Sequence, residues 1–151
     1  MSTVHAVIGI LVVTLNGAAG LWGAYLWARS EAQPAFWTFL RVGQAVLVVQ
    51  VLLGGLLLAL GNEPPSLHIL YGALPLAIVF VAEQLRLVAA EQVLGRRGLA
   101  DTDAMRALPP FDQRVIVLEI VRRETGTVAA GALVAALLAL RAAGVAGGLP
   151  I

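Results

Sequence analysis

Four long apolar stretches limit the folds open to this chain of 151 residues. They cover residues 4–28, 36–60, 66–94 and 111–143. Each is long enough for the roughly 20 residues that cross a hydrocarbon core as a helix, and helices satisfy their own backbone polar groups inside lipid. The sequence therefore predicts an all-α, integral membrane four-helix bundle over residues 1–143 and a flexible tail over residues 144–151.

Composition supports the membrane class and narrows the chemistry. Hydrophobic residues make up 60% of the chain and charged residues 13%, whereas about a quarter of an average soluble protein is charged. A net charge of +1 gives no reason to expect a nucleic-acid partner. The chain has no cysteine, which excludes disulfides, thiolate metal sites and cysteine catalysis. Redox chemistry would require a bound cofactor, and the expected surroundings are a lipid bilayer.

The arginines predict the orientation in the membrane. All ten basic residues are arginine, and nine of them lie in or beside the first and third connections between the apolar stretches. The positive-inside rule places these connections in the cytoplasm and both termini outside, as in a multi-pass protein of the cell membrane. Charged residues also continue the third and fourth helices beyond the apolar slab, so we expect both helices to extend into the cytoplasm. The first stretch lacks a basic n-region and is too long for a signal peptide, so we expect it to remain in the mature protein.

The two histidines of the chain are the main functional clue. His5 and His68 each precede a glycine by four residues, Gly9 and Gly72, and the predicted topology places both histidines on the outer side. Imidazole is a common axial ligand of heme, and facing helices of a bundle can build such a site. Each glycine would lie one turn deeper on the same face and leave room for a porphyrin edge. No third ligand accompanies the pair, as a zinc or copper site would need.

A simpler interpretation of the histidines stays open. An imidazole in the first turn of a membrane helix can lie at headgroup level and bond water or a neighbouring backbone. The same choice applies to Gln50, which shares a face of the second helix with Gly54: its amide could join two helices or orient a ligand. Asn16, in mid-membrane, is expected to form an interhelical hydrogen bond.

Other features of the sequence predict local structure. Pro75 should bend the third helix and open space beside it, and Ser66 is placed to cap that helix. Near the cytoplasmic ends, Glu119 has the spacing to pair with Arg122 and Arg123 on one helix surface. We expect these charges to form a solvated collar rather than a proton or ion path.

The order of these motifs resembles a half-bundle of the heme A synthase family over roughly residues 4–83. The shared features are a helix that opens with His and a Gly one turn on, a helix with Gln-x-x-x-Gly-Gly from Gln50 to Gly55, and a helix that opens with Leu67-His68. In that family each half is a four-helix bundle with a heme near its outer face. The resemblance implies heme b, with His5 and His68 as the ligands of its iron.

The differences from that family bear on activity. Its catalytic half has a glutamate three residues before the first histidine, where this chain has Ser2, and the outer cysteine pair of many members is absent. Heme A synthesis, and enzyme activity in general, is therefore not expected. The sequence predicts a membrane b-type heme protein for electron transfer, redox sensing or service as an accessory subunit of a membrane complex. The alternative is a heme-free membrane protein that acts through partner binding or homo-oligomerisation; the polar residues give little support for a transporter.

Overall fold

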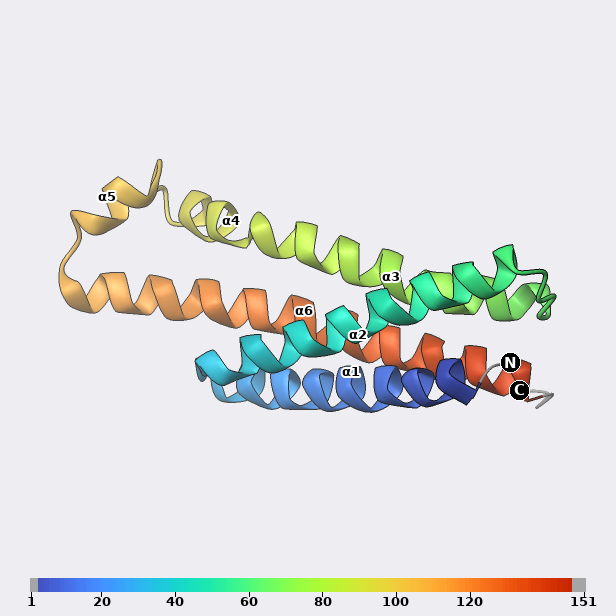
Figure 1. The fold of residues 1–151 in the computed structure, drawn as a ribbon. Helices are drawn as coiled ribbons and strands as arrows, with labels where there is room; N and C mark the ends of the chain where they lie inside the picture. The colour runs from blue at the N-terminus through green and yellow to red at the C-terminus, as the bar shows by residue number, and fades with distance from the viewer. Residues whose placement is uncertain (1–2, 148–151) are drawn as a thin grey trace.

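The computed structural model describes residues 3–147, and this part of the chain consists of helices without strands. The helices are α1 (Thr3–Arg29), α2 (Pro34–Ala59), α3 (Ser66–Leu87), α4 (Ala89–Arg96), α5 (Thr102–Arg106) and α6 (Pro110–Ala146) (Figure 1). Four helical segments are long and apolar enough to cross a membrane: α1, α2, the α3–α4 segment and α6. The all-α class and the four long apolar helices are confirmed, and these helices are consistent with a multi-pass membrane protein.

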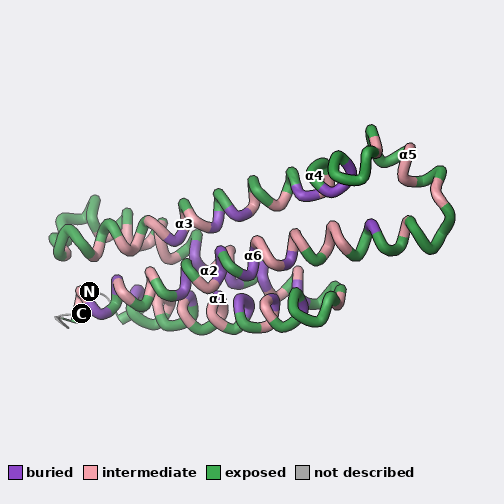
Figure 2. Tube along the Cα trace, turned by 180° about the vertical axis from the view of Figure 1, so that it is seen from behind, coloured by how far each residue is buried: buried purple, intermediate pink, exposed green. Residues whose placement is uncertain are grey.

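Helix α6 is the central element of the bundle. It packs along α1 on one side and along α3 on the other, whereas α2 packs mainly on α1 and touches α3 only briefly. Two clusters of buried side chains hold these helices together. One contains Ala19, Leu26, Phe36, Leu40, Val128 and Ala132; the other contains Val12, Leu47, Val79 and Ala135. Figure 2 shows the buried residues concentrated where the four long helices run side by side.

Glycine lets α6 approach both of its neighbours closely. A Cβ atom added at Gly20 of α1 would lie 2.5 Å from Cγ and 2.9 Å from the backbone nitrogen of Leu133. A Cβ atom at Gly131 of α6 would lie 2.6 Å from Cβ of Ala82 on α3. Membrane helices lack a hydrophobic driving force between them and associate through close packing of this kind.

Polar side chains join the helices at two levels. The amide of Asn16 on α1 donates to the carbonyl of Gly43 on α2 at 3.1 Å, which confirms the predicted interhelical bond. Nearer the α1–α2 connection, the carboxylate of Glu83 on α3 accepts hydrogen bonds from Nη1 and Nη2 of Arg41 on α2, at 2.8 and 3.0 Å. The same carboxylate accepts from Gln44 at 2.9 Å and from Arg86 at 2.9 Å. This network joins α2 to α3, which otherwise pack weakly.

The ends of two helices differ from the prediction. The third helix is interrupted at Val88, and the short α4 that follows buries Val93 and Leu94 against Ile116 of α6. Helix α6 continues to Ala146, so the first residues of the predicted flexible tail are helical; Gly144 is buried there, and this packing holds the last turn in place. Residues 148–151 of that tail lie outside the described residues.

Two predictions of local structure, the pairing of Glu119 and the cap at Ser66, differ from the structure. Helix α5 and the start of α6 extend past the ends of α1 and α2, whereas α4 lies about level with those ends (Figure 1). Glu119 accepts from Arg97 at 2.6 Å, so its predicted pairing within α6 is wrong, because the returning chain brings Arg97 closer. The predicted Ser66 cap is also wrong, because Pro65 occupies the N-cap position and Ser66 is already helical.

Candidate functional site

A cavity of about 910 Å³ lies within the bundle at the end where α1 begins, α2 turns into α3 and α6 ends. This volume falls in the range of roughly 300–1,000 Å³ typical of small-molecule sites. All six residues predicted for the site line it: His5, Gly9, Gln50, Gly54, His68 and Gly72. Three helices thus contribute the predicted residues to one half-open cavity. Their role as binding residues stays a prediction.

His68 is held by a backbone group of α6. Its Nδ1 atom lies 2.9 Å from the carbonyl oxygen of Ala142. A carbonyl can only accept, so Nδ1 carries the proton and, in the neutral ring, Nε2 carries the lone pair. Histidines that ligate metals nearly always donate their other ring N–H to a carbonyl, carboxylate or water in this way. The arrangement therefore leaves Nε2 as the ring atom of His68 that carries a lone pair.

His5 is buried, with only 6% of its surface exposed. Its Nε2 atom lies 3.3 Å from Nε2 of Gln50, so the amide of α2 contacts the imidazole of α1. A Cβ atom at Gly54 would lie 3.3 Å from Cε1 of His5, which places the ring against the bare backbone of α2. Gln50 and Gly54 thus both contact the His5 ring, from the two sequence positions predicted to share a face.

The imidazole of His5 on α1 and that of His68 on α3 lie beside each other in an edge-to-face arrangement. Their ring centroids are 6.0 Å apart and their planes differ by 63°. Two imidazoles that ligate one metal from opposite sides, at about 2.0–2.1 Å each, have ring centroids about 6 Å apart. Within residues 3–147 no group of three or more His, Asp or Glu side chains is placed to hold a metal ion. The separation of the two rings fits a group that takes two histidine ligands, as a bis-histidine heme does.

The predicted glycines have different surroundings. A Cβ atom at Gly9 would lie 3.1 Å from Nε2 of Gln50, so Gly9 makes room for the amide rather than for open space. A Cβ atom at Gly72 would meet no atom within 4 Å, so this position opens on the cavity. Of the two His-x-x-x-Gly motifs, only the one on α3 leaves free space at its glycine.

The floor and the rim of the cavity have different character. Val12, Leu47, Pro75 and Ala139 line its deeper part, and the first two also belong to the core beneath it. The turn residues Asn62, Glu63, Pro64 and Pro65 line the rim. An apolar floor with a polar rim suits a flat apolar molecule whose polar edge points outward.

Sequence reasoning missed the contribution of α6. Ala139, Leu140, Ala142, Ala143 and Ala146 line the cavity, and the Ala142 carbonyl fixes the tautomer of His68. A backbone carbonyl has no sequence signature, and alanines are common throughout α6. Arg141 does not line the cavity; its guanidinium lies over the ring of Tyr71, 5.4 Å from the centroid.

Comparison with known protein families, with curated proteins and with solved structures found no match to this chain. The resemblance to heme A synthases therefore stays a prediction, and the functional argument depends on the geometry of the site.

Proposed function

We propose that the chain is a membrane b-type heme protein with His5 and His68 as the axial ligands of one heme. The observation that carries the proposal is the 2.9 Å hydrogen bond from Nδ1 of His68 to the Ala142 carbonyl, which prepares Nε2 as a ligand atom. The centroid separation of 6.0 Å between the two rings supports the same pairing.

Each part of the cavity has a task in this proposal. The Ala142 carbonyl would orient His68 and the backbone at Gly54 would position His5, while the Gln50 amide, 3.3 Å from Nε2 of His5, would have to move aside for that nitrogen to bind iron. The open space beside Gly72 would take part of the macrocycle, and the apolar floor would keep water from it. When bound, heme supplies one-electron redox chemistry, and the apolar surroundings and axial ligands set its potential.

The proposed role is electron transfer, redox sensing or service as a heme-bearing subunit of a membrane complex. Heme A synthesis is not proposed, because Ser2 stands where the family's catalytic half has a glutamate. The distribution of arginines supports an orientation with the heme toward the outer face and the α3–α6 extension in the cytoplasm.

Absorption spectroscopy tests the proposal. Protein expressed with heme available should show a Soret band and, after reduction with dithionite, a sharp α band. His5→Ala and His68→Ala should each lose the sharp α band, because one remaining histidine leaves the iron high-spin, and the double variant should lose the heme itself. Asn16→Ala is the matched control: it removes a buried polar side chain of α1 that does not line the cavity, so it should retain heme. A colourless wild-type protein, or full heme in the double histidine variant, would contradict the ligand assignment.

A second candidate is a heme-free protein that acts through a partner or through self-association. The observation in its favour is the extension formed by α5 and the start of α6, where Phe111 is 76% exposed. An exposed aromatic of this kind suits a protein interface. A Phe111→Ala variant that loses oligomer or partner, in protein without heme, would favour this function.

A further inference from the structure

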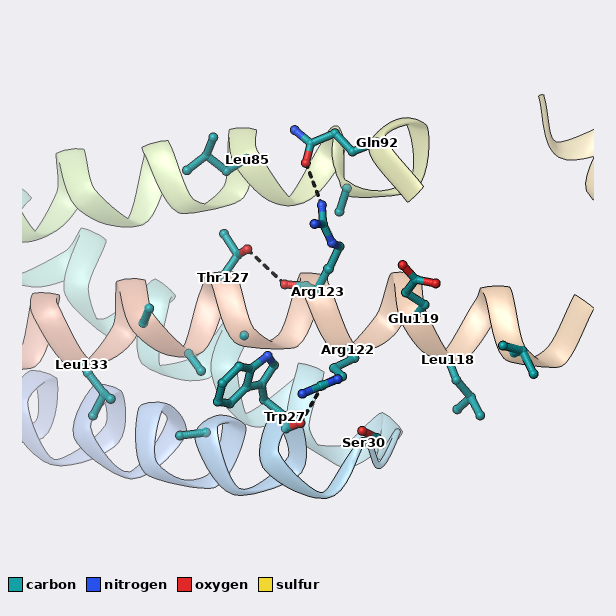
Figure 3. Close-up of a pocket in the computed structure, with 16 residues that line it drawn as sticks. Trp27, Ser30, Leu85, Gln92, Leu118, Glu119, Arg122, Arg123, Thr127 and Leu133 are labelled. Carbon is teal, nitrogen blue, oxygen red and sulfur yellow. Dashed lines mark hydrogen bonds between the residues drawn. The ribbon is translucent and has the colours of Figure 1, made fainter. Parts of the chain in front are cut away.

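A second hollow lies on the opposite end of the bundle from the histidines. It is a groove of about 1050 Å³ between the end of α1, the α3–α4 segment and α6 (Figure 3). One stripe of α6, from Val115 to Leu133, forms its floor. Helix α2 lies away from this groove and contributes no residue to it. The groove is therefore an open face of the α1–α6–α3 layer.

Two guanidinium groups occupy opposite walls of the groove. Arg122 reaches toward α1, where Nε donates to the Trp27 carbonyl at 3.2 Å and the guanidinium lies 5.4 Å from the Trp27 ring centroid. Arg123 reaches toward α4 and donates from Nη1 to Oε1 of Gln92 at 2.9 Å (Figure 3). Both contacts are to neutral groups. Within residues 3–147 neither arginine has a carboxylate within ion-pair distance.

The one carboxylate in the groove is already neutralised. Oε2 of Glu119 accepts from Nε and Nη2 of Arg97 at 3.0 and 2.6 Å. The groove thus keeps two positive charges without a counter-charge. Both arginines retain N–H groups that can donate to an anion, because a guanidinium has five donors.

The polarity of the groove changes along α6. Around Arg122 and Arg123 it offers donors and hydroxyls, with Gln92, Thr127 and Ser30 nearby. Toward the membrane centre it is lined by Ala130 and Leu133, and Gly126 makes room for the Trp27 ring, which lies 2.6 Å from where a Cβ would be. A cationic end followed by an apolar trough matches a phospholipid, with its phosphate at the arginines and an acyl chain over Leu133.

We propose that this groove binds an anionic phospholipid of the cytoplasmic leaflet. Basic pockets between membrane helices are known to hold anionic head groups, and the arginine distribution places this end of the bundle at that leaflet. A membrane helix of another protein would need an acidic side chain opposite each arginine, whereas the phosphate of a lipid can meet the arginine on either wall while its acyl chain lies along the apolar part of the groove. The inference is independent of heme binding at the other end.

Lipid titration of the purified protein tests the proposal. The protein in detergent is titrated with dioleoylphosphatidylglycerol, with dioleoylphosphatidylcholine and with glycerol phosphate, and bound lipid is counted by native mass spectrometry. Phosphatidylglycerol should bind at one site and raise the unfolding temperature. The double variant R122Q/R123Q should lose roughly 30-fold in affinity, since each arginine contributes a factor of about five near an anionic head group. Arg114→Gln is the matched control, because it removes the same charge from α6 outside the groove.

The possible results separate the occupants. Equal binding of the two lipids, or equal loss of phosphatidylglycerol in the Arg114→Gln control, would overturn the proposal. Glycerol phosphate binding as tightly as the lipid would overturn it as well, because the apolar trough would then contribute nothing. If the lipid-free protein is a dimer and R122Q/R123Q is a monomer, the occupant of the groove is a second copy of the chain instead. If R122Q/R123Q unfolds, the single Arg123→Gln variant, with an expected loss of about fivefold, decides the matter.

Discussion

His68 and Ala142 are joined by a hydrogen bond of 2.9 Å between Nδ1 of the imidazole and the backbone carbonyl of α6. The bond connects the first turn of α3 to the last turns of α6, 74 residues later in the chain. It determines which ring nitrogen of His68 carries the lone pair that can bind a metal or accept a hydrogen bond. The proposed ligand therefore depends on the packing of two helices as well as on its own identity.

The contact between His5 and the backbone at Gly54 predicts a selective effect of a small substitution. In Gly54→Ala the new Cβ would lie 3.3 Å from Cε1 of His5, so the ring must move by a few tenths of an ångström. Heme affinity should fall several-fold, because metal ligands tolerate little displacement. Hemin titration of the apo-protein measures the affinity.

Gly55→Ala is the control for this experiment. A Cβ at Gly55 meets no atom within 4 Å, and both variants gain the same helix propensity of about 1 kcal/mol. Equal heme affinity in the two variants would argue that His5 is not held against α2 as described.

The open space beside Gly72 predicts that heme can be excluded without unfolding the protein. In Gly72→Phe the phenyl ring can enter the cavity, because no atom lies within 4 Å of the new Cβ. Heme binding should be lost while the helical circular dichroism spectrum is unchanged. Unchanged heme content in a folded Gly72→Phe protein would mean that the macrocycle lies elsewhere.

The close approach of α1 to α6 predicts a difference between two glycines of one helix. Gly20→Ala should destabilise the protein by about 1–3 kcal/mol, because the new Cβ would overlap Leu133, including its backbone nitrogen at 2.9 Å. Gly17→Ala should be tolerated, since its Cβ would lie 3.8 Å from that of Ala136. Unfolding by sodium dodecyl sulfate, followed by circular dichroism, compares the two. Similar stability would show that the helices can separate at Gly20 at little cost.

The Glu83 network predicts that one carboxylate holds α2 to α3. Glu83→Gln should lower the free energy of unfolding by about 2 kcal/mol, because the charge-assisted bonds to Arg41 and Arg86 lose their acceptor charge. Asp103→Asn is the control: its ion pair with Arg106 is exposed, with side-chain exposures of 81% and 73%, and should contribute almost nothing. An equal effect of the two substitutions in the same unfolding assay would contradict the assigned role of Glu83.

The helices were predictable because apolar runs of this length have few alternatives in lipid. The residues at which the helices end were harder to predict from the sequence. No proline or glycine near Val88 indicates that the helix is interrupted there. Gly144 is helical because of tertiary packing, although glycine usually disfavours a helix. The pairing of Glu119 with Arg97 depends on how the α4–α5 segment returns to α6, which helical spacing alone does not contain.

The sequence predicted where the site lies better than it predicted which groups contact the histidines. Topology placed His5 and His68 at one end of the bundle, and spacing placed Gln50 and Gly54 on one face. What sequence could not supply was the Ala142 carbonyl, since every residue has one, or the different surroundings of Gly9 and Gly72. These depend on the crossing of four helices in three dimensions.

The most direct test of the central claim is ligand rescue at the two histidines. Apo-protein is titrated with hemin, and the ferric electron paramagnetic resonance spectrum is recorded for wild type and for His68→Ala with and without free imidazole. The account predicts one heme per chain and a low-spin spectrum in wild type, a high-spin spectrum in His68→Ala, and return of the low-spin spectrum when imidazole is added. A low-spin spectrum in His68→Ala without imidazole would contradict ligation by this residue.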